Sequence, residues 1–344
     1  MKKSNFILLL GLALLLSTAM IEGYADDQQD GYCYQEPTNC CASTCCEWTC
    51  SKEALYWTSE EDGLSYANKP SNILTTDDFT KTGLVHPNFH WEYGFCLQGG
   101  YAPHNSPWSY KIAWTYLASK ATAAQYVDSD SPTWLGSFPV WSMAPSTLPG
   151  DYVSSSRMRW YLHTNIIDLD VKYAYCGFDN LILSPQIGLR CAILNQKLHV
   201  VYEGGSFFSG PDDNLMRNRF LGVGPRVGLN GEYCLGYGFS IRAFAAVAGM
   251  YGHYRDSHRE EYIETSIFSQ SSTSNHLAVS FDYRAGLAWK GKIFSCWPNV
   301  DVMISWDGHE FFNQNRMYRG NLGFFKKDRN LTLEGVTLSA FFCF

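Results

Sequence analysis

The stretch Leu331 to Phe344, LTLEGVTLSAFFCF, decides the fold. Counting back from the last residue in steps of two gives an unbroken apolar row: Phe344, Phe342, Ala340, Leu338 and Val336. A period of two is typical of a β-strand, because successive side chains point to opposite faces of a sheet. A final strand that has an apolar face and ends on an aromatic residue is typical of the closing strand of an outer-membrane β-barrel. The alternative is an ordinary terminal strand of a soluble β-sandwich.

The first 25 residues have the pattern of a secretory signal peptide. Two lysines precede the apolar run Phe6–Leu16, and small residues stand at Gly23 and Ala25, three and one before the expected cleavage point. The apolar run is too short for a transmembrane helix. We therefore predict that residues 1–25 are removed and that the mature chain is exported.

Composition favours a membrane barrel over a soluble domain. Charged residues make up 17% of the chain and aromatic residues 16%, while mean hydropathy is −0.20. No later window approaches eighteen consecutive apolar residues, so no transmembrane helix is predicted. Alternating lipid-facing and lumen-facing residues cancel in any window, which explains a chain rich in aromatic residues but not hydrophobic on average. The net charge of −7 argues against nucleic acid as a partner.

Alternating apolar positions recur along residues 51–344 and predict about ten strands, with twelve as the upper alternative. The predicted strands are 53–67, 89–101, 108–119, 157–176, 181–202, 218–231, 236–250, 276–290, 299–307 and 331–344. Long polar connections are expected at 68–88, 120–156, 203–217, 251–275 and 308–330, and short ones between them. This alternation predicts an antiparallel outer-membrane β-barrel with short periplasmic turns and long extracellular loops. A soluble sandwich would not need every second loop to be long.

Charged side chains stand opposite the apolar rows of the predicted strands. The candidates for the barrel interior are Lys172, Arg190, Arg226, Arg242, Arg284, Asp168, Asp170, Asp282 and Asp301. An Arg or Lys that faces lipid at mid-depth costs about 2–4 kcal/mol, so these residues are expected to point inward. They would either line a water-filled pore or pair as Arg–Asp bridges that plug it, because a barrel of about eight strands has room only for side chains. Asp282 and Arg284, with their neighbours, suggest one such pair. The sequence leaves pore and plug open.

Tryptophans near the strand ends predict the two aromatic girdles of a membrane barrel. These residues are Trp91, Trp108, Trp160, Trp289 and Trp306.

Six of the twelve cysteines crowd the segment 26–50, which we interpret as a periplasmic N-terminal extension. They are Cys33, Cys40, Cys41, Cys45, Cys46 and Cys50. Cysteines in an exported chain indicate disulfides. Zinc is disfavoured because the segment contains two Cys-Cys doublets and no histidine, and no metal or cofactor is expected. Disulfides within the chain and disulfides to neighbouring envelope proteins both remain open.

The enzymatic alternative is a surface protease, since some membrane barrels of this size are proteases. Its candidates would be His253, Asp256 and His258, in a predicted outer loop. A solvated polar loop explains the same residues. The sequence contains none of the G-x-S-x-G, H-E-x-x-H or P-loop patterns, and we expect no enzymatic activity.

Short motifs in a fixed order give the chain a family resemblance from about residue 51 onward. They are Ala54–Trp57, Glu61–Ala67, Leu162–His163, Asp168–Asp170, Ile187–Arg190, Leu221–Leu229, Asn313–Met317 and Leu333–Leu338, followed by the final Phe344. With these motifs the chain resembles the Legionella-type pore-forming major outer-membrane proteins, which include porins of chlamydia-related bacteria. The Cys-rich segment departs from the pattern and is similar to the disulfide-linked envelopes of chlamydial bacteria.

The resemblance implies a barrel in the outer membrane of the cell that conducts ions or small hydrophilic solutes, and it supplies no catalytic residues. Implied partners are outer-membrane lipids, the barrel-assembly machinery, which would recognise the terminal Phe342 and Phe344, and other Cys-rich envelope proteins joined through disulfides. A non-conducting structural or adhesive barrel that displays long loops is the alternative function.

Overall fold

The computed structural model describes residues 48–69, 83–103, 106–126, 138–139, 141–142, 153–178, 180–205, 207–263, 265–291, 300–315, 317 and 330–343. In this part of the chain no helix has the length and apolar character needed to cross a membrane.

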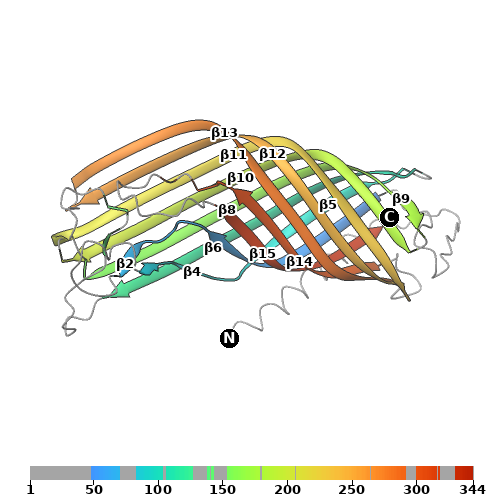
Figure 1. The fold of residues 1–344 in the computed structure, drawn as a ribbon, viewed down its shortest axis with the longest axis horizontal. Helices are drawn as coiled ribbons and strands as arrows, with labels where there is room; N and C mark the ends of the chain where they lie inside the picture. Colours follow the sequence, from blue (N-terminus) through green and yellow to red (C-terminus); the bar gives the residue numbers. More distant parts are fainter. Residues whose placement is uncertain are drawn as a thin grey trace, which may run out of the picture.

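Within the described residues, ten long antiparallel strands close into a ring (Figure 1). In ring order they are β1 (Trp48–Glu61), β5 (Glu92–Tyr101), β6 (Trp108–Tyr126), β8 (Ser155–Tyr173), β10 (Leu181–Gly204), β11 (Phe207–Gly236), β12 (Phe239–Tyr262), β13 (Thr265–Gly291), β14 (Val300–Phe312) and β15 (Leu331–Cys343). The ring closes where β15 pairs with β1, from Thr49 opposite Cys343 to Glu61 opposite Leu331. The predicted fold class, an antiparallel barrel of about ten strands, is confirmed.

Five short strands complete the described structure. β4 (Asn88–Phe89) pairs with β6, and β9 (Tyr175–Phe178) pairs with β10. A separate small sheet joins β2 (Ala67–Lys69) to β3 (Gly83–Val85) and β7 (Phe138–Pro139).

The two ends of the barrel differ. We call the end with Trp48, Cys343 and the turn Tyr237–Gly238 the terminal end. The distal end is the opposite end, where β10 ends at Gly204 and β12 ends at Tyr262. Figure 1 shows the distal end on the left, where β10 to β13 reach furthest, and the terminal end on the right, beside β9.

Apolar side chains cover the outside of the barrel. The outward row of β10 includes Ile187 and Leu189, which are 62% and 53% exposed. Leu221 and Val223 on β11 and Ile304 on β14 belong to the same belt. In β15 the residues Thr337 and Ser339 are buried while Val336, Leu338 and Ala340 lie on the more exposed face, as the sequence predicts. Phe342 is half-buried, and Phe344 lies outside the described residues.

The expectation of long loops at 203–217 and 251–275 is wrong. β10 ends at Gly204 and β11 begins at Phe207, while β12 ends at Tyr262 and β13 begins at Thr265, so both predicted loops are mostly strand. Outward side chains in this part are polar, for example Arg217 and Arg255. The backbone ladder continues beyond the apolar belt because its hydrogen bonds do not depend on what the outward side chains contact. The connections after β1, β6 and β14 remain long.

The first strand also begins earlier than residue 51, the predicted start of the barrel. Trp48, Thr49 and Cys50 belong to β1 and pair with β5 and β15. Cys50 is therefore a strand residue and not part of the N-terminal extension.

The distal half of the barrel is filled by an apolar core, which includes Trp57, Trp160, Leu194, Phe220, Tyr254 and Phe311. Trp160 is wholly buried and packs edge-on against Phe89 with ring centroids 5.7 Å apart, so its assignment to an aromatic girdle is wrong. Even-numbered residues of β8 face inward at this level, and strand alternation overrides nearness to a strand end. Trp91, Trp108 and Trp306 are exposed on the outside.

Described residues from two connections between strands pack in the same distal half. The Trp141 indole Nε1 donates a hydrogen bond to the carbonyl oxygen of Ser65 over 2.9 Å, and the Tyr202 hydroxyl donates to the carbonyl oxygen of Tyr66 over 2.6 Å. Trp141, Ser65 and Tyr66 are all buried. These polar contacts satisfy backbone groups that would otherwise be costly inside an apolar core.

Candidate functional site: a charged cavity inside the barrel

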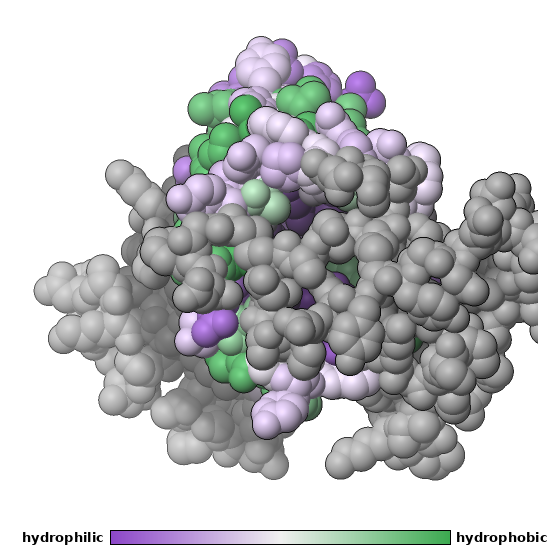
Figure 2. All heavy atoms as spheres, turned by 90° about the vertical axis from the view of Figure 1, so that its right-hand side faces the viewer, coloured by the Kyte–Doolittle hydropathy of each residue, from purple (hydrophilic) through white to green (hydrophobic). Residues whose placement is uncertain are grey.

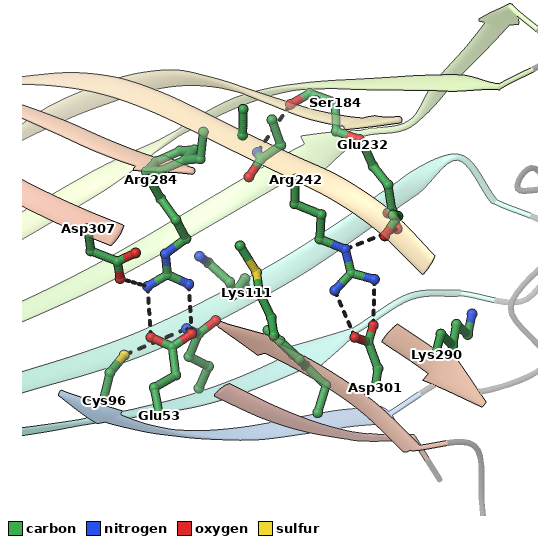
Figure 3. Close-up of a pocket in the computed structure, with 18 of the residues that line it drawn as sticks. Glu53, Cys96, Lys111, Ser184, Glu232, Arg242, Arg284, Lys290, Asp301 and Asp307 are labelled. Atoms are coloured by element: carbon green, nitrogen blue, oxygen red, sulfur yellow. Dashed lines mark hydrogen bonds and ion pairs between the residues drawn. The ribbon is translucent and has the colours of Figure 1, made fainter. Parts of the chain in front are cut away.

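A cavity of about 910 Å³ occupies the terminal half of the barrel. It reaches from the turn Tyr237–Gly238 inward to Asp168, Arg226 and Asp282 at mid-barrel. Figure 2 looks onto the terminal end and shows apolar residues around the outer wall, with hydrophilic residues visible deeper inside. Figure 3 shows the side chains that project into the cavity from several strands.

Arg190 forms the centre of a buried ion-pair group at the inner end of the cavity. Its Nε and Nη2 donate to the two carboxylate oxygens of Asp168 over 2.7 and 2.8 Å, and its Nη1 donates to Asp282 over 2.7 Å. Asp168 is its direct neighbour on β8, whereas Asp282 lies on β13, three strands away around the ring. The Arg190 side chain is completely buried.

Arg226 of β11 joins the same group from the side. Its Nη1 donates to both oxygens of Asp170 over 2.9 and 2.7 Å, and its Nη2 donates to Asp282 over 3.0 Å. His309 lies opposite Asp282 on β14, with its Nδ1 at 2.8 Å from the same carboxylate. One carboxylate thus contacts two guanidinium groups and a histidine. Bidentate pairs of this kind hold buried charges in place.

Small residues on the neighbouring strands leave room for the arginine side chains to extend across the barrel interior. Gly188 lies in register between Asp170 on β8 and Arg226 on β11, and a Cβ there would overlap the Leu169 carbonyl oxygen and lie 2.6 Å from Asp170 Oδ1. In the same way, Ala246 on β12 lies in register between Gly228 on β11 and Asp282 on β13. The motifs 187–190 and 221–229 therefore combine an inward arginine with the inward glycines over which side chains cross.

A second ion-pair group lies on the opposite wall. Arg284 donates from Nη1 and Nη2 to the two oxygens of Glu53, over 2.8 Å each, and its Nη2 lies 2.7 Å from Asp307. Both carboxylate side chains are almost fully buried, while Arg284 is 22% exposed. This group ties β13 and β14 to β1.

The third group lies nearer the terminal end. Arg242 donates to both oxygens of Asp301 over 2.9 and 2.7 Å, and its Nε donates to Glu232 over 3.0 Å. These side chains are 18–30% exposed, so solvent reaches them from the cavity. In Figure 3 the Arg242 and Arg284 groups lie on either side of Lys111.

All nine charged residues that the sequence selected face the interior of the barrel. Seven of them form the mid-barrel and Arg242 groups, Arg284 joins Glu53 and Asp307, and Lys172 lines the cavity. Asp282 and Arg284 do not pair with each other. Sequence reasoning left out Glu53, Lys111, Glu232 and His309, although their positions in the alternating strands place all four on the inward face.

The other candidate residues are dispersed. Cys50 is exposed and carries a free thiol, and Cys33, Cys40, Cys41, Cys45 and Cys46 lie outside the described residues. His253 faces outward on β12, whereas His258 faces the interior, so the protease candidates do not converge. No group of three or more His, Cys, Asp or Glu suited to a metal ion occurs in the described part of the chain.

A closed antiparallel ring with an apolar outer belt and a charged interior defines an outer-membrane β-barrel. The family model described as the Legionella pneumophila major outer membrane protein precursor matches residues 40–344. The chain belongs to this family, and the predicted resemblance and the outer-membrane location are confirmed. No curated protein sequence matches the chain.

Solved outer-membrane proteins show a distant likeness. A Pseudomonas aeruginosa FadL homologue is 8% identical, with 87% of this chain and 90% of that chain covered and a TM-score of 0.28. A mutant of the monoaromatic hydrocarbon channel TodX is 8% identical, with coverages of 87% and 91% and a TM-score of 0.25. The outer-membrane protein OmpT of Vibrio cholerae is 9% identical, with coverages of 92% and 100% and a TM-score of 0.17.

Proposed function

We propose that this protein is a narrow outer-membrane channel for ions and small hydrophilic solutes. The observation that supports the proposal best is the charged cavity, which leads from the terminal end to the ion-pair groups at mid-barrel. Barrels of this class place both termini and the short turns in the periplasm, so the cavity would open to the periplasm. Rings of charged side chains are the common means by which a pore selects solutes.

The apolar core of the distal half sets a condition on conduction. Among the described residues, Trp160, Phe220 and Tyr254 of the apolar core lie on the distal side of the Arg190 group. A solute that enters the cavity crosses the membrane only when part of this core and the inserted segment at 141–142 rearranges. We therefore expect a small, intermittent conductance and not a wide, permanently open pore.

Single-channel recording of the refolded chain from residue 26 onward tests the channel. We expect discrete current steps in a planar bilayer, and a reversal potential in a salt gradient that reports the sign of the preferred ion. Arg242→Gln should shift the preference toward cations, because it leaves Asp301 and Glu232 without their shared guanidinium group. A correctly folded, heat-modifiable barrel that never conducts would exclude the channel.

A structural barrel without conductance is the second candidate. The apolar distal core and the strand-crossing ion pairs favour it, since both stiffen a barrel at the expense of open volume. This protein would then serve the envelope by its mechanical stability or by its exposed distal surface. The silent, folded barrel described above is the result expected for this function.

We also propose that the N-terminal cysteines join the barrel to other envelope proteins. Cys50 supports this because it carries a free, exposed thiol at the terminal end of β1, directly after the Cys-rich segment. Non-reducing electrophoresis of cell envelopes should show high-mass complexes that a reductant dissolves. Replacing the cysteines of 33–50 with serine should abolish them, and complexes that persist in this variant would contradict the proposal.

A further inference from the structure

Two lysines lie close together on one wall of the cavity. Lys111 lies 3.7 Å from Asp170, but that carboxylate is already held by Arg226 at 2.7 and 2.9 Å. Lys172 makes no ion pair with any described residue, although it lines the cavity. Asp170 is the direct partner of Lys111 across β6 and β8, and Lys172 lies two residues further along β8. The two lysines are therefore diagonal neighbours on one inward face. The carboxylate that Lys111 contacts, Asp170, is already bound by Arg226.

The group near the terminal end presents carboxylates to the cavity. Glu232 and Asp301 share the single guanidinium of Arg242, and both carboxylates remain partly exposed to the cavity at 30% and 18%. Lys290 lies opposite Asp301 on β13 but forms no ion pair with it, and Figure 3 shows its ammonium directed away. Each of the two carboxylates therefore presents part of its surface to the cavity.

The cavity as a whole is nonetheless balanced. Its cationic lining residues are Lys111, Lys172, Arg226, Arg242, Arg284 and Lys290. Its anionic lining residues are Glu53, Asp168, Glu232, Asp282, Asp301 and Asp307. Equal numbers give the cavity little net attraction for a simple ion of either sign, while the two lysines and the Glu232–Asp301 pair present opposite charges at separate places. Apolar side chains such as Phe244, Met303 and Phe341 line the same space.

We propose that this cavity binds small zwitterionic solutes of the amino-acid and short-peptide class. The solute carboxylate lies at Lys111 and Lys172, its ammonium group lies at Glu232 and Asp301, and its carbon skeleton lies against the apolar lining residues. A simple anion would be repelled by the acidic group that it must pass, and a simple cation by the lysines. The proposal deepens the channel function because it names the class of solute that enters from the terminal end.

Equilibrium binding to the refolded, detergent-solubilised barrel tests the proposal, with glycylglycine, acetate and methylammonium as probes in calorimetry. We expect glycylglycine to bind most tightly. The double variant Lys111→Gln/Lys172→Gln and the single variant Glu232→Gln should each weaken glycylglycine binding about tenfold, as expected for the loss of a charged hydrogen bond. Lys120→Gln is the matched control, because Lys120 lies on the same strand as Lys111 but faces outward, and its binding should be unchanged.

A charge-conserving variant separates loss of binding from loss of folding. Lys111→Arg/Lys172→Arg should keep glycylglycine affinity within about twofold of the parent, since the positive charge is retained. Acetate or methylammonium binding as tightly as glycylglycine would overturn the proposal, as would an unchanged affinity in the Gln variants. Because binding is measured without conduction, a silent barrel that binds the dipeptide contradicts only the channel, and a conducting barrel that does not bind it contradicts only this inference.

Discussion

Gly188 illustrates how one residue without a side chain makes the interior possible. It stands in register between Asp170 and Arg226, and the Arg226 side chain passes over it to reach the carboxylate. Its role depends on space and not on backbone conformation, because the conflict of an added Cβ is with the Leu169 carbonyl oxygen and Asp170.

Gly188→Ala should therefore destabilise the barrel by about 1–3 kcal/mol, the usual cost of overpacking a filled interior. Urea unfolding of the refolded protein measures the change. Gly99→Ala is the control, because a Cβ at that position on β5 would meet nothing closer than the Ile112 side chain at 3.6 Å, and its unfolding midpoint should match the parent. Equal unfolding midpoints for both variants would show that the barrel interior accommodates a Cβ at position 188.

The distal hairpins carry a titratable group outside the membrane belt. Asp212 of β11 accepts a hydrogen bond from Asn214 over 2.8 Å, and Asn214 also contacts the ring of His258 at 3.1 Å. Burial, followed by the nearby charge of Glu260, raises the pKa of Asp212 from 3.8 to about 7. Burial lowers the pKa of His258 from 6.5 to about 4.

These two shifts oppose each other over the same pH range. The folded state holds a proton on Asp212 that the unfolded state releases above pH 3.8, so the Asp212 contribution to stability falls as pH rises from about 4 to about 7. The unfolded state takes a proton on His258 below pH 6.5 that the folded state refuses until about pH 4, so the His258 contribution falls as pH drops through that interval.

Single variants should expose each contribution. In Asp212→Asn, hydrogen-exchange protection of residues 207–216 and 254–262 should decrease as pH is lowered from 6.5 to 4.5, because only the His258 effect remains. In His258→Gln, protection of the same residues should decrease as pH is raised from 4.5 to 7. Protection factors corrected for intrinsic exchange provide the measurement. The same pH slope in both variants would contradict this account.

At the scale of the whole molecule, Asp282 links walls of the barrel that are far apart along the ring. Its carboxylate, almost fully buried, contacts Arg190 of β10, Arg226 of β11 and His309 of β14. Because its partners lie on separate strands, Asp282 helps to fix the cross-section of the barrel. Loss of its charge should therefore destabilise every strand that it joins.

Asp282→Asn should lower the free energy of unfolding by about 3–5 kcal/mol, because it leaves buried guanidinium groups without their shared counter-charge. Urea titration followed by the loss of heat-modifiable migration measures the effect. The control is Arg157→Gln, since Arg157 and Glu203 form an ion pair that is 47% and 42% exposed, and such a pair contributes at most about 1 kcal/mol. Similar losses in the two variants would mean that the mid-barrel group adds little to stability.

The sequence by itself determined the class of fold. Alternation in Leu331–Phe344 and its counterparts predicted ten to twelve strands and the outward face of each, because the period of two is a local property of each strand. The inward direction of Arg190, Asp282 and the other charged candidates followed as well, because lipid excludes them from the other face. The same argument also predicts that Glu53 and Lys111 point inward.

Only the tertiary structure decided which charges meet and how much of the interior stays open. Arg190 contacts Asp282 three strands away. Strand register makes this pairing possible, because Gly224 on β11 lies opposite Arg190 and Ala246 on β12 lies opposite Asp282. The apolar filling around Trp160 and the length of the distal hairpins were also beyond local patterns. Both depend on side chains that meet across the closed ring, and closure brings together residues that no periodicity along the chain connects.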